Sequence, residues 1–132
     1  MTFIFFSQIV STQAAQKPER GFRELNRFKA SEAQAVAVDE TSFYAISSRE
    51  VARYDKTSGK QLTKWTGPKD SHIRHLNSGI VTGGKLYCAH SNWPQNPLKN
   101  TIEVFKPESL EHLETLTFPE TAGAINWVDH RG

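Results

Sequence analysis

Three histidines lie close together near the middle of the chain and are the first candidates for chemistry. His72 and His75 are three residues apart in HIRH, and His90 follows the run LYCA. Imidazole is a common ligand of zinc and other divalent metals. At this spacing two imidazoles converge on one ion when they share a helix, but HIRH lies in an apparent loop before a strand. The spacing therefore predicts no metal site, and the sequence identifies no cofactor.

A second group of polar and aromatic side chains flanks two strand-like runs, residues 79–81 and 85–90. In an antiparallel meander, the loop that enters the first strand lies at the same end as the loop between the second and third strands. This places His75 and Asn77 beside His90, Asn92 and Trp93, with Arg49 contributed by the preceding repeat. A polar, aromatic and partly cationic surface at the entrance of a propeller's central channel suits a small anionic or sugar-like ligand. The candidate ligand-binding residues are Arg49, His75, Asn77, His90, Asn92 and Trp93.

Each of these residues also has an ordinary structural interpretation. Loops are polar in most proteins, so the group could consist of simple turn residues. Trp93 lies in an insertion between Asn92 and Pro94, outside the strand pattern, so ligand stacking or a partner contact stands beside local loop packing as an interpretation. His112 and His130 lie in other contexts and are expected to face solvent.

No catalytic set can be assigned from the sequence. Ser78, His90 and Asp129 could be drawn as a triad, but no nucleophile elbow surrounds the serine. Cys88 is the only cysteine and lies inside a strand-like run, so a buried, unreactive thiol is expected. Catalytic residues therefore stay unassigned, and whether the protein is an enzyme stays open.

The elements that must position these residues form a repeat. AQAVAVDETSFYAIS and HLNSGIVTGGKLYCAHS share an order of strand, turn and aromatic-centred strand, with Tyr44 and Tyr87 43 residues apart. Two further strand-like runs follow in each copy, and the second copy has eight extra residues in SNWPQNPLKN. AINWVD then resembles the start of the first copy, AVAVDE. A period near 43 residues with four short strands is typical of a β-propeller blade.

The predicted fold is therefore all-β: a β-propeller fragment of about two four-stranded antiparallel blades plus the first strand of a third. The first blade covers residues 33–66, the second covers 75–118, and the next begins at 122–129. Propellers close with about four to eight blades, so these repeats cannot form a ring alone. We expect either a fragment of a longer protein or several chains that complete the ring, with self-association through exposed sheet edges in the first case.

The N-terminal residues differ from the rest of the chain. Residues 1–16 contain an apolar run followed by small and polar residues, the order found in a secretory signal peptide, which favours a secreted or periplasmic location. This run is too short for a transmembrane segment, which needs about 20 apolar residues. Residues 17–32 are expected to be a linker and possible ring-closing strand. Sixteen basic and fourteen acidic residues are scattered through the chain, which does not indicate nucleic acid as a partner.

The stretch YAISSREVARYDKTSGKQLTKW, residues 44–65, resembles the blade repeat of YVTN-type and quinoprotein-like β-propellers. In that pattern an aromatic-Asp pair precedes a Gly turn: Asp55 can accept bonds from the turn amides, and Gly59 supplies a positive φ. Lys106 and Pro107 replace this pair in the second copy. The longer stretch of sequence, residues 33–129, is similar to uncharacterised secreted bacterial propellers, some of which are loosely labelled cycloisomerases. This resemblance implies a blade but not a function.

Two classes of function follow. The first is a binding scaffold that takes a small molecule, a glycan or a protein at the propeller face. The alternative is a propeller enzyme of the lactonase, cycloisomerase or quinoprotein-dehydrogenase type, whose channel residues polarise a carbonyl or hold a cofactor. We favour binding, because the repeats show no carboxylate cluster and no convincing metal ligand set.

Overall fold

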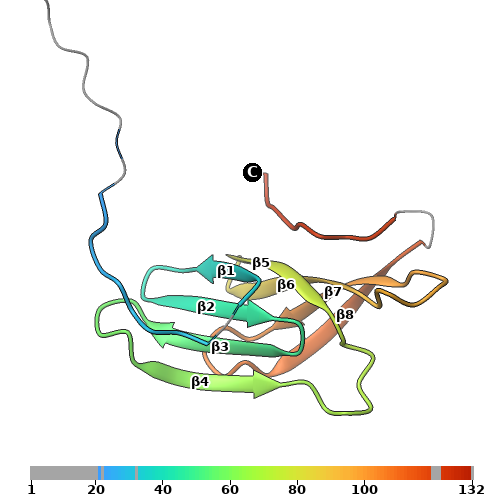
Figure 1. The fold of residues 1–132 in the computed structure, drawn as a ribbon, viewed down its shortest axis with the longest axis horizontal. Helices are drawn as coiled ribbons and strands as arrows, with labels where there is room; N and C mark the ends of the chain where they lie inside the picture. Colours follow the sequence, from blue (N-terminus) through green and yellow to red (C-terminus); the bar gives the residue numbers. More distant parts are fainter. Residues whose placement is uncertain (1–20, 22, 32, 120–122, 132) are drawn as a thin grey trace, which may run out of the picture.

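Two antiparallel sheets make up the computed structural model, which describes residues 21, 23–31, 33–119 and 123–131 (Figure 1). The first sheet has the order β1-β2-β3-β4 and the second β5-β6-β7-β8, so each is an up-and-down meander. No helix is present in the described residues. The all-β prediction and the prediction of two four-stranded antiparallel sheets are confirmed. The strands are β1 (Ala35–Val38), β2 (Ser42–Ser47), β3 (Glu50–Asp55), β4 (Gln61–Thr66), β5 (Leu76–Thr82), β6 (Lys85–Ser91), β7 (Asn100–Phe105) and β8 (His112–Phe118).

Local sequence explains the turns that join the strands. Asp55 Oδ1 accepts the backbone N–H of Thr57 at 3.0 Å and of Ser58 at 2.6 Å, and Gly59 has a φ of 70°. The expected roles of Asp55 and Gly59 are thus confirmed. The corresponding turn of the second sheet has no such aspartate; instead Leu110 takes the positive φ, 58°, and its N–H bonds Lys106 O at 2.8 Å.

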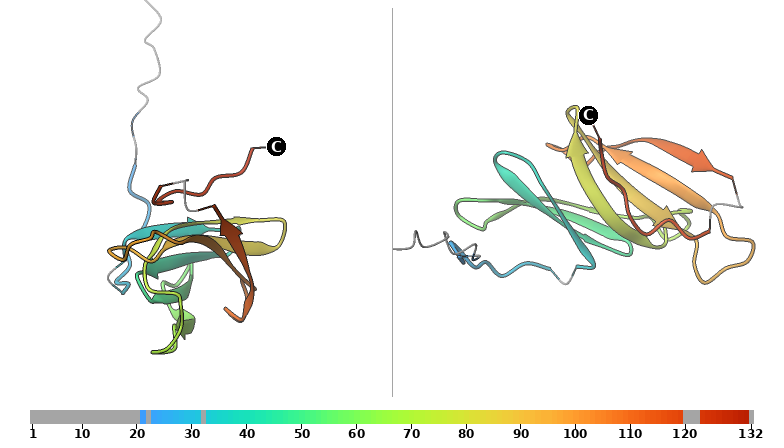
Figure 2. Two further views of the ribbon diagram at one scale, coloured as in Figure 1. Left: turned by 90° about the vertical axis from the view of Figure 1, so that its right-hand side faces the viewer. Right: turned by 90° about the horizontal axis from the view of Figure 1, so that it is seen from above.

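The two sheets pack face to face through one apolar core. Strand alternation points Tyr44 and Ile46 of β2 towards Leu86 and Cys88 of β6, and all four side chains are fully buried. Gly79 of β5 allows the close approach, because a Cβ there would lie 2.4 Å from Ile46 Cδ1. The sheets splay apart beyond this contact (Figure 2). They do not close into a ring.

The segments that flank the sheets cover their outer faces. Phe28 stacks on Phe43 of β2 with ring centroids 6.2 Å apart, and Ser31 bonds the Tyr54 hydroxyl at 3.0 Å. Ile125 and Val128 pack on the outer face of the second sheet. Neither residues 23–31 nor residues 123–131 form a helix or a strand.

The predicted third-blade strand at 122–129 is therefore wrong for residues 123–129, while residue 122 lies outside the described part. A strand needs a backbone ladder, but the N–H groups of Ile125 and Val128 bond side chains of the second sheet instead, Asn100 Oδ1 at 3.1 Å and Ser78 Oγ at 3.0 Å. The predicted signal peptide, residues 1–16, lies wholly outside the described residues. Across the residues that are described, no helix has the length and hydropathy needed to cross a membrane.

Candidate functional site

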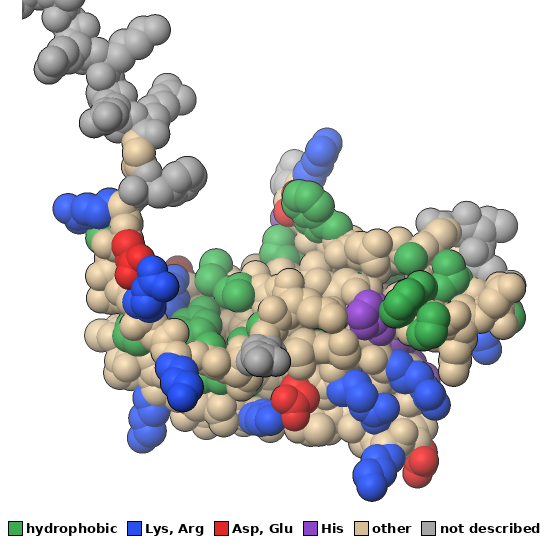
Figure 3. Space-filling model, in the orientation of Figure 1, with side chains coloured by type: hydrophobic (Ala, Val, Ile, Leu, Met, Phe, Trp, Pro, Cys, Tyr) green, Lys and Arg blue, Asp and Glu red, His purple; other side chains and the backbone are tan. Residues whose placement is uncertain are grey.

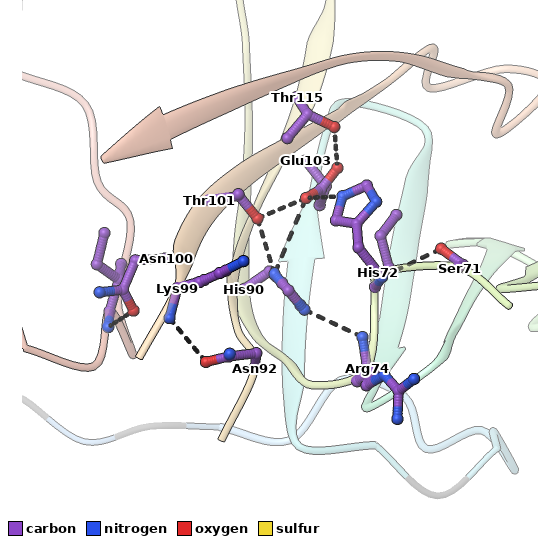
Figure 4. Close-up of polar contacts among 12 residues, drawn as sticks. Ser71, His72, Arg74, His90, Asn92, Lys99, Asn100, Thr101, Glu103 and Thr115 are labelled. Atoms are coloured by element: carbon purple, nitrogen blue, oxygen red, sulfur yellow. Dashed lines mark hydrogen bonds and ion pairs between the residues drawn. The ribbon is translucent and has the colours of Figure 1, made fainter. Parts of the chain in front are cut away.

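Glu103, at the centre of β7, is a completely buried carboxylate. The strand register places it opposite Cys88 of β6 and Thr115 of β8, and places Thr101 opposite His90. Alternation along the strands puts these polar side chains on the face that looks towards the first sheet. His72, from the connection between β4 and β5, completes the group in Figure 4.

Each carboxylate oxygen of Glu103 accepts two hydrogen bonds. Oε1 accepts from His72 Nε2 at 2.9 Å and from Thr101 Oγ1 at 2.5 Å. Oε2 accepts from His112 Nε2 at 2.7 Å and from Thr115 Oγ1 at 2.7 Å. An ionised carboxylate offers about four lone-pair sites, so these donors satisfy it completely. We call these residues, together with His90, the Glu103 cluster.

The hydrogen bonds decide the charge of Glu103. Burial raises the pKa of its carboxyl, but the bonds from Thr101, Thr115, His72 and His112 together outweigh burial and hold the pKa below its ordinary value. The side chain is therefore ionised at neutral pH. A fixed negative charge between two imidazoles orients both rings through their Nε2–H groups.

His90 links the Glu103 cluster to the chain around it. The Arg74 backbone N–H donates to His90 Nε2 at 3.0 Å, so His90 Nδ1 carries the proton and donates to Thr101 Oγ1 at 2.7 Å. Thr101 in turn donates to Glu103, which completes a one-directional chain of hydrogen bonds (Figure 4). Burial, ahead of the opposing attraction of Glu103, lowers the pKa of His90 to about 4. His90 is thus neutral at physiological pH, and both its nitrogens are occupied.

A hollow of about 930 Å³ opens beside the cluster. It is bounded by the β4–β5 connection, the loop 92–99 and the strands β7 and β8. Basic side chains gather over the β4–β5 connection, next to a histidine, in Figure 3. His72, Arg74 and Lys99 supply the basic groups of the lining, and Asn92, Gln95 and Asn96 supply amides. Among the described lining residues there is no Asp or Glu.

The structure separates the six candidate ligand-binding residues into two sets. His90 and Asn92 line the hollow. Asn92 also shapes the loop, because its Nδ2 donates to Pro97 O at 3.1 Å and its Oδ1 accepts the Lys99 N–H at 2.7 Å.

The remaining four candidates lie outside the hollow lining. Trp93 is 60% exposed and packs on His75, with ring centroids 5.8 Å apart. The Arg49 guanidinium donates to the carbonyls of Gly67 and Pro68 and fastens the β4–β5 connection. Asn77 donates to Ile125 O at 3.2 Å on the opposite face of the sheet.

Sequence reasoning missed the most important residue of the cluster. Glu103 lies in NTIEVF, a strand in which every residue is buried, and a lone acid at an inward position of such a strand is the signal that could have found it. The prediction that His112 faces solvent is wrong, because its Nε2 bonds Glu103 and its ring packs on Phe105. His130 is exposed, as predicted.

The Glu103 cluster can orient the imidazoles of His72 and His112 and hold a negative charge, but it is not suited to binding a metal ion. Both oxygens of Glu103 face N–H and O–H donors at hydrogen-bond distance, which leaves no lone pair for a cation. Within the described residues no group of three His, Cys, Asp or Glu side chains could hold a metal ion. Comparison with known proteins adds no family to this description, because no protein-family model and no curated protein matches the chain.

Proposed function

We propose that the two sheets are neighbouring blades of a YVTN-type or quinoprotein-like β-propeller and that this protein is a secreted or periplasmic binding scaffold. The shared strand order and the face-to-face packing of successive meanders support the blade interpretation. The apolar run near the N-terminus supports export. The ligand we propose is a small, polar anion.

The basic lining of the hollow is the observation that carries this proposal. Arg74 and Lys99 are exposed and line the hollow with His72, and no carboxylate of the described lining opposes them. Glu103, the buried acid beside His72, is outside the lining and fully bonded, so it orients His72 while Arg74 and Lys99 face the ligand. Charge-assisted bonds from Arg and Lys are the usual means of holding carboxylate or phosphate groups.

Isothermal titration calorimetry with citrate, inorganic phosphate and glucose tests the proposal. We expect binding of at least one anion and none of the neutral sugar. Each of Arg74→Gln and Lys99→Gln should weaken anion binding by about ten- to 150-fold, because one charge-assisted bond contributes about 1.5–3 kcal/mol. Lys106→Gln is the matched control, since Lys106 is exposed at the far end of β7. Equal binding of glucose would favour a glycan, and no binding of any probe would contradict the proposal.

The alternative of an enzyme has one observation in its favour. His72 lines the hollow, and its Nε2–H donates to an ionised, buried carboxylate. A carboxylate that orients an imidazole in this way supports general-base chemistry, as a lactonase or cycloisomerase would need. Lactone hydrolysis by the wild type that is lost in His72→Gln, with anion binding retained, would favour this alternative.

A further inference from the structure

The basic hollow offers more chemistry than a bare anion needs. Its volume, about 930 Å³, suits an organic small molecule and is far larger than inorganic phosphate requires. Besides the cations of Arg74 and Lys99, the lining contains amides, hydroxyls and one aromatic ring. These additional groups indicate which class of anion makes the most contacts.

The amides and hydroxyls of the lining fall into two sets. Some are engaged within the protein: Asn92 bonds the backbone of its own loop, and Thr115 bonds Glu103. Others line the hollow and are exposed, namely Gln95, Asn96 and Thr117. Amides and hydroxyls both donate and accept hydrogen bonds, as the hydroxyl groups of a sugar do. The exposed set therefore matches a ligand that carries several hydroxyl groups.

Phe118 adds an aromatic surface to the lining. It is the last residue of β8, lines the hollow and is 43% exposed. An exposed aromatic ring offers a flat apolar face, and a sugar ring presents C–H groups on a face of similar size. Inorganic phosphate and open-chain carboxylates have no such face. Phe118 therefore favours a ligand that contains a ring.

We propose that the ligand of the hollow is an acidic sugar, a sugar ring that carries one carboxylate or phosphate group. This inference rests on the proposed anion-binding function and adds to it the ring and its hydroxyl groups. Arg74 and Lys99 hold the anionic group through charge-assisted bonds. Gln95 and Thr117 bond hydroxyl groups of the sugar, and Phe118 packs on the apolar face of its ring. A bare anion or a neutral sugar makes only part of these contacts.

Isothermal titration calorimetry with matched probes separates the ring from the charge. Glucuronate is compared with acetate, and glucose 1-phosphate with inorganic phosphate, so that each pair shares its anionic group. We expect at least one acidic sugar to bind about tenfold more tightly than its matched anion, and the pair that shows this identifies the anionic group. Acidic sugars that bind no more tightly than their matched anions, or no more tightly than glucose, would overturn the inference. If the anions bind in that case, the proposed anion-binding function stands; if no probe binds, citrate included, both fail.

Two variants test the residues assigned to the sugar ring. Phe118→Ala and Gln95→Ala each remove a ring contact and leave Arg74 and Lys99 in place. Each should weaken binding of the acidic sugar by about threefold or more and leave binding of the matched anion unchanged. Leu116→Ala is the control for Phe118→Ala, because Leu116 is exposed on the same strand and lies outside the lining of the hollow. Unchanged sugar binding in both ring-contact variants, or an equal loss in the control, would overturn the inference.

Discussion

Replacement of Glu103 by glutamine tests whether a buried charge stabilises this fold. The substitution keeps the volume of the side chain but removes its charge, so the bonds from His72, Thr101, His112 and Thr115 lose their charged acceptor. The new NH₂ group also faces two donors where an oxygen accepted them. A hydrogen bond to a charged group contributes about 1.5–3 kcal/mol.

The net cost is smaller than the sum of these bonds. Threonine hydroxyls can rotate, and His72, whose side chain is 55% exposed, can turn to water. We therefore expect Glu103→Gln to lower the free energy of unfolding by about 2–3 kcal/mol, and Glu103→Ala, which adds a cavity and unpaired donors, by about 3–5 kcal/mol.

Equilibrium unfolding in urea, followed by tryptophan fluorescence, measures this loss. Trp65 reports on the core because it packs edge-on against Phe105, with ring centroids 4.9 Å apart. The midpoint should fall while the slope is unchanged, as expected for a change in stability alone. Glu114→Gln is the matched control, since Glu114 pairs with Lys85 on the surface and its loss should hardly move the midpoint.

The pH dependence of the free energy of unfolding separates the contribution of the Glu103 charge from that of its packing. The pKa of Glu103 is lowered in the folded state, so its stabilisation is present above the unfolded value, about 4.3, and is lost as the pH falls through the folded value. The difference between wild type and Glu103→Gln should therefore be largest near pH 7 and shrink below about pH 4. An equal midpoint for the two proteins at pH 7 would refute the argument that the carboxylate is a net stabilising charge.

Three further outcomes follow from other buried groups. Because the pKa of His90 is lowered to about 4 in the folded state, only the unfolded state takes up its proton between about pH 6.5 and 4. Stability should therefore fall by about 1–3 kcal/mol over that range, and His90→Gln should flatten the dependence; an unchanged slope in urea midpoints would contradict this. Gly79→Ala should cost about 1–3 kcal/mol, since its Cβ would lie 2.4 Å from Ile46 Cδ1, and adding Ile46→Val should recover part of the loss. Without such recovery in the double variant, the clash is not the cause. Burial, with the field of Glu103, raises the pKa of Cys88, so a disulfide reagent should label this thiol only in concentrated urea, and labelling of the folded protein would show that the core opens.

Local chemistry in the sequence was sufficient to predict the strands and their turns. Short apolar runs bounded by turn residues, such as SFYAIS, mark strands, and Asp55 with Gly59 marks the turn between β3 and β4. These features depend on residues a few positions apart, so the sequence contains them directly. The third-blade strand failed because a strand also needs a partner, and the similarity of AINWVD to AVAVDE contains no information about one.

The candidate site depended on contacts between distant residues. His72 and Glu103 are 31 positions apart and meet through Nε2 and Oε1, and the sequence around neither residue predicts the other. The sequence suggested Asn77 as a ligand-binding residue. In the structure Asn77 lies at the bulge between Leu76 and Ser78, and its side chain bonds Ile125 O on the outer face of the sheet. The register of β6, β7 and β8 decides which side chains share a face, and it is a property of the assembled sheet.

By itself, the sequence determined an all-β chain with two four-stranded antiparallel sheets, because periodicity and turn residues act locally. Only the tertiary structure decided that a buried glutamate holds two histidines beside a basic hollow, and that Ile125 and Val128 pack on the outer face of the second sheet. The physical reason is that a buried charge is tolerated only where several separate elements bring donors to it, and those elements meet only when both sheets have formed.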